Sequence, residues 1–245
     1  MVPPAPFIDA GISTLRNGGI LAITATDLTA LCGIYPKAGF RKYFSNIFKT
    51  FFCHEVALRV LISNLALSAG RHNLTIKPLL SIFTDQYARI HVKVYPGRRS
   101  FPFREIGFII FGRDSIDVVE FYGVKPGELG GEGILLGPLW IGDINDINVL
   151  EYILENDLVN YIYINEDRVR ARNLLRVLIN ECGYPPFYYD IHKLSSIVKV
   201  SPPPIDMIIR RLRENGYRAT RTHFSNYGVK SDCSFREFLS LLGGR

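Results

Sequence analysis

The segment from residue 78 to residue 95 constrains the fold of this chain more than any other part of its sequence. Residues 78–83 are mostly apolar, Thr84-Asp85-Gln86 supplies a tight polar turn, and residues 87–95 alternate between apolar and polar side chains. Alternation with a period of two predicts a strand with one buried face, and so short a connection joins antiparallel strands. We therefore expect a β-hairpin. The side chains expected to face its core are Ala88, Ile90, Val92 and Val94.

Three further elements are predicted before the hairpin. Residues 7–16, after an extended proline-rich start, and residues 54–69 carry apolar side chains at helical spacing. Between them, residues 20–26 form a short, nearly all-apolar run, which is typical of a strand buried on both faces of a parallel sheet. The resulting order is helix, buried strand, helix, strand, tight turn, strand. It is similar to the back half of the sheet in Rossmann-like methyltransferases, where the last two strands form an antiparallel pair.

Composition predicts a globular protein. The 245 residues, 47% of them hydrophobic, are enough for one sizeable core or two modest ones. No apolar run reaches about 18 residues and no secretory signal is recognisable, so we expect neither a membrane span nor export, and we place the chain in the cytoplasm. The cysteines are scattered without a Cys-x-x-Cys pair, which predicts reduced thiols and neither a metal site nor a disulfide framework.

The net charge of +6 is distributed unevenly along the chain. Residues 35–104 carry twelve Lys or Arg against two acidic residues, whereas residues 105–200 carry eight against fifteen, and residues 201–245 carry eight against four. Clustered cations indicate a polyanionic partner. Nucleic acid is favoured over an anionic membrane because no amphipathic basic helix stands out. A solvated basic surface with no partner is the alternative that the sequence leaves open.

The first basic block contains the segment YPKAGFRKYFSNIFKTFF at residues 35–52, which interleaves cations with seven aromatic side chains. Cations bind phosphate, and aromatic rings stack on unpaired bases. We therefore predict an RNA-binding segment, while aromatic rings that only fill the core beneath a loop are an equally good interpretation. The cations predicted to contact RNA here are Lys37, Arg41, Lys42 and Lys49.

The C-terminal part predicts a smaller α+β unit. Helices are expected at residues 146–155 and 165–180, the second capped by Asn165. A short helix at 192–200, a proline-rich turn, a helix ending at Asn215 and a strand at 217–224 follow, an order that suggests a winged-helix-like unit. Its second half is rich in arginine, which predicts RNA contact, with protein contact as the alternative. These residues are Arg210, Arg211, Arg213, Arg218 and Arg221.

Several segments resemble one enzyme family in order along the chain. These segments are APFIDAGISTLRNGGILAITATDLTALCG, YPKAGFRKY, FCHEVALRVLISNL, KPLLSIFTDQYARIHVKVYPG, GPLWIGDIND and YRATRTHFSNYGVKSD. Together they resemble the archaeal tRNA (guanine-26 N2)-dimethyltransferases. The resemblance implies an α/β fold, with residues 1–132 as the back half of a class I methyltransferase domain and residues 133–245 as a C-terminal tRNA-binding domain. It also implies methyl transfer from S-adenosylmethionine to N2 of guanine 26 in tRNA.

The resemblance has a consequence for the start of the chain. The family's active-site motif, Asp-Pro-Phe-Gly, lies immediately before the segment that matches residues 6–9, and the strands that hold the cofactor lie further upstream. The expected catalytic Asp therefore falls before Met1, and we expect the chain alone to be inactive. A fragment, a misplaced start codon and a split enzyme with a separately encoded N-terminal half remain open. The alternative function is a stand-alone RNA-binding or regulatory protein derived from such an enzyme.

Four residues are predicted to line a guanine pocket. Thr26 and Asp27 lie at the carboxyl end of the strand at 20–26, and ligands of open α/β sheets bind at the carboxyl ends of strands. The alternative for Asp27 is that its side chain caps the following short helix. The target guanine must leave its stack to react, and Phe7 and Tyr43 are predicted to stack on the extruded base.

Overall fold

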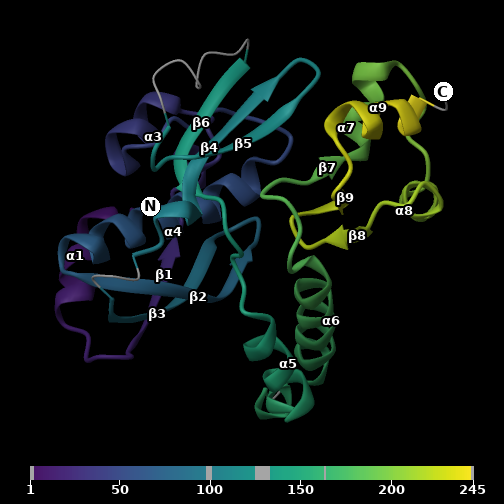
Figure 1. Ribbon diagram of the computed structural model, residues 1–245. Helices are drawn as coiled ribbons and strands as arrows, with labels where there is room; N and C mark the ends of the chain where they lie inside the picture. The colour runs from purple at the N-terminus through teal and green to yellow at the C-terminus, as the bar shows by residue number, and fades with distance from the viewer. Residues whose placement is uncertain (1–2, 98–100, 125–132, 163, 244–245) are drawn as a thin grey trace.

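The computed structural model describes residues 3–97, 101–124, 133–162 and 164–243 (Figure 1). Within these ranges the strands form three antiparallel sheets of three strands each. No helix in the described part of the chain is long and apolar enough to cross a membrane. The first two sheets share the central helix α4 (Cys53–Arg71), and the third belongs to a C-terminal unit.

The first sheet contains the predicted hairpin. Strands β2 (Leu74–Phe83) and β3 (Ala88–Pro96) pair antiparallel, and β1 (Ile20–Ala25) pairs antiparallel with the other edge of β3. The order β1-β3-β2 therefore leaves β1 and β2 parallel to each other but not adjacent. The prediction for the hairpin face is confirmed, because the side chains expected in the core are all buried. Helix α4 covers β2 and β3, and α1 (Ala5–Ser13) packs on α4.

The prediction that residues 20–26 form a strand buried on both faces of a parallel sheet is wrong. Strand β1 runs antiparallel to β3, and its burial alternates: Ile23 and Ala25 are buried, whereas Thr24 is exposed and Ile20 is 57% exposed. The physical reason is that β1 lies at the edge of the described sheet. Side chains on one face reach the core, and those on the other face meet solvent.

The second sheet follows the 3-10 turn η1 (Phe103–Glu105) and has the order β5-β4-β6. Its strands are β4 (Ile106–Gly112), β5 (Ile116–Glu120) and β6 (Gly133–Trp140). A backbone bridge between Asn46 and Gly137 ties this sheet to the segment after α3 (Pro36–Tyr43), with N–H to carbonyl distances of 2.7 and 2.9 Å.

The expected boundary between residues 132 and 133 falls at residues 125–132, which lie outside the described residues. Strand β6 begins at Gly133 and pairs with β4, so one sheet takes strands from both sides of that position. The division of the chain into units 1–132 and 133–245 therefore stays a prediction. A cut at this point would separate β6 from both β4 and α4.

The four helices and the strand predicted in the C-terminal part occur in the predicted order, with further elements that the sequence analysis did not predict (Figure 1). It comprises α5 (Ile147–Glu155), η2 (Leu158–Tyr161), α6 (Asn165–Glu181), β7 (Tyr189–Asp190), α7 (Ile191–Val198), α8 (Ile205–Glu214), β8 (Ala219–Thr222), β9 (Ser225–Ser231) and α9 (Phe235–Gly243). The strands pair in the order β7-β9-β8. A winged-helix-like relationship for this unit stays a prediction.

The two helix starts predicted in this part have different outcomes. Asp146 caps α5, accepting a hydrogen bond from the Asn148 backbone N–H at 3.2 Å. The cap predicted for Asn165 is wrong, because Asn165 is already the first helical residue of α6 and Ile164 occupies the cap position. Its side chain therefore does not stand where it could accept from the orphan amides of the first turn.

A buried ionic cluster connects α4 to the second sheet and to the C-terminal unit. Glu55 Oε1 accepts hydrogen bonds from Arg59 Nη2 at 2.7 Å and from Lys230 Nζ at 2.6 Å. Arg59 Nη1 also donates to the Trp140 carbonyl of β6 at 3.0 Å. Burial opposes ionisation of Glu55, but the charges of Lys230 and Arg59 outweigh it and lower the pKa of Glu55. Burial lowers the pKa of Lys230, and the Glu55 carboxylate opposes that effect.

We expect Lys230→Ala to destabilise the fold strongly, because removing one member of a buried ionic cluster costs about 3–5 kcal/mol. Chemical denaturation of the 245-residue chain measures this. The matched control is Arg221→Ala, which removes an exposed ion pair with Asp206 and should cost only about 0–1 kcal/mol. Equal losses in the two variants would contradict the importance of the cluster.

Candidate nucleic-acid interface

Asp27 is a buried carboxylate directly after β1. It is 2% exposed, and it accepts hydrogen bonds from Lys42 Nζ at 2.9 Å and from the Tyr43 hydroxyl at 2.8 Å. Both partners lie in the last turn of α3. Asp27 stands at the cap position of the short helix α2 (Leu28–Leu31), but its side chain makes no capping hydrogen bond to that fully described helix, so the capping alternative is wrong. The Asp27 carboxylate instead fixes the end of α3 against β1.

The structure corrects the stacking role predicted for Tyr43. This side chain is 1% exposed, so its ring is not accessible to a base. Burial and the hydrogen bond to the Asp27 carboxylate raise the pKa of Tyr43 well above its ordinary value, and the phenol is therefore a neutral donor. The ring of Phe7 on α1 is exposed, as stacking requires, and Thr26 is also exposed.

A basic pocket lies where α1 begins, beside the ends of α3 and α4. This cavity of about 470 Å³ is lined by Pro6, Arg41 and Lys42, together with Arg71 of α4. Asp27 neutralises Lys42 in part, whereas the ion pair that Arg71 makes within the described residues is a long one, 3.9 Å to the exposed Asp9. We name this cavity the basic pocket. Its cations suit a phosphate group or another anion.

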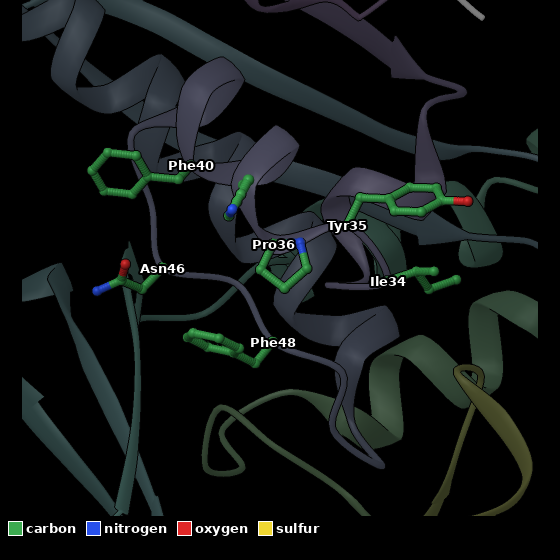
Figure 2. A pocket seen from close by; sticks show the side chains of 7 residues that line it. Ile34, Tyr35, Pro36, Phe40, Asn46 and Phe48 are labelled. Atoms are coloured by element: carbon green, nitrogen blue, oxygen red, sulfur yellow. The ribbon is translucent and has the colours of Figure 1, made fainter.

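A second, aromatic pocket opens beside α3 (Figure 2). Its volume is about 630 Å³, and Figure 2 shows Asn46 between the rings of Phe40 and Phe48. Tyr35 and Phe40 on its wall are 62% and 53% exposed. The full lining is Ile34, Tyr35, Pro36, Lys37, Phe40, Asn46 and Phe48.

Glycine is required at one point behind this pocket. Gly33 has a φ of +73°, and a Cβ there would lie 2.3 Å from the carbonyl carbon of Phe48. Any side chain would therefore push the segment that carries Phe48 away from α2. The core-filling interpretation of residues 35–52 is confirmed for three of the seven aromatic residues, and RNA binding by the other four stays a prediction. Tyr35, Phe40, Phe44 and Phe48 are exposed, whereas Tyr43, Phe51 and Phe52 fill the core.

The predicted cations of the first basic block differ in how far they are available. Lys37, Arg41 and Lys49 are exposed, whereas Lys42 is half-buried in its ion pair with Asp27. Lys37 lines the aromatic pocket and Arg41 lines the basic pocket. The block therefore presents cations beside both cavities.

The arginines of the C-terminal unit serve mainly its own structure. Arg213 donates two hydrogen bonds to the Ala219 carbonyl, at 2.8 and 3.2 Å, and Arg211 donates to the Leu241 carbonyl at 3.3 Å. Arg210 is exposed, and its side chain has no hydrogen bond or ion pair to the described residues. Of these three arginines, Arg210 is thus the one held by no such contact.

The remaining two arginines of this group form exposed ion pairs. Arg218 Nε donates to Asp232 at 2.8 Å, and its guanidinium lies 4.8 Å from the centre of the Tyr184 ring. Arg221 donates to Asp206, also at 2.8 Å. These carboxylates reduce the positive field of the unit, which the sequence pattern did not reveal.

The structure contains a group of potential metal ligands that the sequence pattern did not predict. The structure brings Cys32 together with Cys53 and His54, and one ligand atom of each lies within 4.8 Å of the others. A Cys-x-x-Cys motif could not reveal this group, because Cys32 and Cys53 are distant in sequence and lie close together only in the folded chain. The adjacent pair Cys53-His54 at a helix start was the local signal available.

Comparison with known proteins places this geometry in context. The family model for N2,N2-dimethylguanosine tRNA methyltransferase matches residues 3–243. The chain belongs to this family. A tRNA (guanine(26)-N(2))-dimethyltransferase from Methanothermobacter thermautotrophicus is 33% identical, with 98% of the chain and 64% of that protein covered. A tRNA (guanine(26)-N(2))-dimethyltransferase from Pyrococcus abyssi is 34% identical, with 98% and 62% covered.

A solved structure agrees with the family assignment. It is described as Trm1 from Pyrococcus horikoshii in complex with S-adenosyl-L-methionine, and it matches with a TM-score of 0.86 and 30% identity. The match covers 98% of this chain and 63% of that one. The chain thus spans a little under two thirds of the length of these dimethyltransferase relatives. The family resemblance seen in the sequence is confirmed.

We expect Phe40→Ala to weaken tRNA binding, because an exposed ring that stacks on a base contributes about 1–3 kcal/mol. Titration of labelled tRNA with the chain measures the change. Tyr161→Ala is the matched control, since Tyr161 is an exposed aromatic residue of η2 remote in sequence from the pocket. An equal effect of both substitutions, or none from Phe40→Ala, would show that the aromatic pocket does not bind RNA.

Proposed function

We propose that this chain is the tRNA-binding and guanine-positioning part of an S-adenosylmethionine-dependent tRNA (guanine-26 N2)-dimethyltransferase. The observation that carries the proposal is the basic pocket at the start of α1, in a chain that matches the family from residue 3 to residue 243. In the family, the motif Asp-Pro-Phe-Gly lies immediately before the segment that matches residues 6–9. The basic pocket therefore adjoins the place where the reaction is expected. No observation favours the stand-alone regulatory alternative.

The residues of the pocket have distinct proposed roles. The exocyclic amine of guanine delocalises its lone pair into the ring, so methyl transfer needs an acceptor that binds the amine and takes its proton. The aspartate of the family motif is the expected acceptor. Asp27 is already occupied by Lys42 and Tyr43, and we assign it a positioning role. Thr26 is placed to contact guanine, and the exposed ring of Phe7 to stack on it.

The cofactor supplies the methyl group when bound. We propose that the residues holding it lie mainly in the part of the relatives that this chain does not match. The chain alone is then inactive, and a polypeptide bearing Asp-Pro-Phe-Gly, fused or separately encoded, completes the enzyme. Support comes from the coverage of 62–64% of the relatives. We also propose a cytoplasmic location, which fits a role on tRNA.

Calorimetry of the purified 245-residue chain with S-adenosylmethionine tests this division. We expect no saturable binding at micromolar concentration, and we expect binding and tRNA methylation after addition of the completing polypeptide. The Trm1 of Pyrococcus horikoshii, whose structure holds the cofactor, is the positive control. Saturable binding to the chain alone would refute the proposed division while leaving family membership intact.

The salt dependence of tRNA binding tests the role of the cations. Affinity should fall steeply with salt, because each phosphate contact releases counterions. We expect the triple variant of Lys37, Arg41 and Lys49 to alanine to flatten the dependence, by about one unit of slope per lost contact. The matched control removes three exposed cations outside the two basic blocks. These are Arg170, Arg176 and Lys199. An unchanged slope in the first variant would exclude this face from phosphate binding.

A further inference from the structure

Two cysteines and a histidine form a compact cluster between α2 and α4. Cys32 follows the last residue of α2, Cys53 is the first residue of α4, and His54 is the next. The two sulfur atoms and a ring nitrogen of His54 all lie within 4.8 Å of one another. Both cysteines are only 6% exposed. The cluster lines neither the basic pocket nor the aromatic pocket.

The backbone holds the sulfur atoms in place. The Cys32 N–H donates to the Leu28 carbonyl at 2.7 Å, which fixes Cys32 at the end of α2. The close approach of Gly33 to Phe48 then brings the segment leading to Cys53 against α2. Two ligands from separate elements are therefore positioned by the fold before any ion arrives, which reduces the ordering cost of binding.

The imidazole of His54 is also oriented. Its ring stacks on Phe83, with centres 4.4 Å apart and planes 13° apart, and its Nδ1 lies 3.0 Å from the Phe224 carbonyl oxygen. A carbonyl accepts only, so Nδ1 carries the proton and donates it, and Nε2 keeps its lone pair. A backbone carbonyl that binds one ring nitrogen is the usual outer partner of a metal-binding histidine.

The thiols are polarised unequally. The thiol of Cys32 donates a hydrogen bond to Cys53, and this hydrogen bond lowers the pKa of Cys53. The same hydrogen bond and burial raise the pKa of Cys32. Coordination to a metal ion deprotonates a thiol outright, so the raised pKa of Cys32 is no obstacle to its serving as a ligand.

We propose that Cys32, Cys53 and His54 bind one soft divalent cation of the zinc class. Two thiolates and an imidazole bind zinc in preference to magnesium or calcium, which favour oxygen ligands. A water molecule would be the fourth ligand of a tetrahedral zinc ion. Binding forms two metal–sulfur bonds and one metal–nitrogen bond, the ion gives up the water molecules that these ligands replace, and the thiol protons leave to solvent. Nothing is oxidised or reduced. Such an ion would brace the α2 to α4 segment, which carries Tyr35, Phe40 and Phe48 of the aromatic pocket.

Titration of the reduced, metal-free 245-residue chain with cobalt(II) tests the site. We expect thiolate-to-cobalt charge-transfer absorption and tetrahedral d–d bands that saturate at one equivalent and disappear when zinc is added. Zinc should also raise the melting temperature, because it binds only the folded arrangement. Absence of the bands from the reduced chain overturns the proposal, and so does a spectrum of octahedral cobalt.

Two variants locate the ligands. Cys53→Ser and His54→Gln should each weaken zinc binding by about tenfold or more. Cys182→Ser is the matched control, because the thiol of Cys182 donates to the Leu178 carbonyl at 3.3 Å, away from the cluster. Equal affinity in all three variants overturns the assignment. Should a variant fail to fold, the titration of the unaltered chain decides.

The competing chemistry for this pair is a disulfide. Thiol counting on the chain purified without reductant reports it. A chain in which Cys32 and Cys53 are joined, and whose reduced form still shows no cobalt bands, has a redox pair here and no metal site. That outcome would not affect the proposed role in tRNA methylation, which rests on other residues.

Discussion

A single buried carboxylate, Glu55, connects the three parts of this molecule. Its oxygen is shared by Arg59 of the same helix and by Lys230 of β9. Arg59 reaches onward to the carbonyls of Trp140 and Gly142, and Lys230 to that of Pro185. Desolvating these charges is costly, so the cluster is stable only when all its partners are in place. Helix α4 can therefore adopt its buried position only if the second sheet and the C-terminal unit dock on it correctly.

The candidate interface depends on that central helix. Helix α4 provides Arg71 and Asn64 to the basic pocket, and Asn64 donates to the Tyr43 carbonyl at 2.5 Å. Asp27 then binds the side chains of Lys42 and Tyr43. The wall of the basic pocket is thus held by hydrogen bonds that connect the buried helix α4 and Asp27 to the exposed end of α3. Its cations are presented on a rigid support, which is what precise placement of a nucleic-acid substrate requires.

The sequence predicted elements whose signal is local. The alternation from Ala88 to Val94 predicted the buried face of the hairpin, and the apolar stripe of residues 54–69 predicted helix α4. The stripe did not reveal that α4 is buried on nearly all sides, Glu55 and Arg59 included. Burial on both faces was wrong for residues 20–26, since an apolar run does not reveal whether a strand lies at the edge of a sheet. For the rest of the fold, the family resemblance predicted more than the amino-acid composition did.

Side-chain roles in the site were harder to predict, because they depend on partners distant in sequence. The sequence predicted that Tyr43 stacks on a base, but in the fold its hydroxyl donates a hydrogen bond to Asp27. It predicted that Arg218 contacts RNA, but in the fold its guanidinium pairs with Asp232. Cys32 and Cys53 likewise meet only in three dimensions. Charge clustering along the chain therefore located the basic block, but it could not separate cations that face solvent from cations that pair internally.

The backbone bridge between Asn46 and Gly137 connects the aromatic pocket to strand β6 of the second sheet. Asn46 lines the aromatic pocket, while its backbone pairs with β6 in the second sheet. Thermodynamic linkage is reciprocal, so a ligand that binds more tightly when Asn46 is held by this bridge also favours the hydrogen-bonded form of β6 at Gly137. Amide hydrogen exchange at that strand would then slow when the pocket fills. Hydrogen exchange in the second sheet would then report whether a ligand occupies the aromatic pocket, although β6 does not line that pocket.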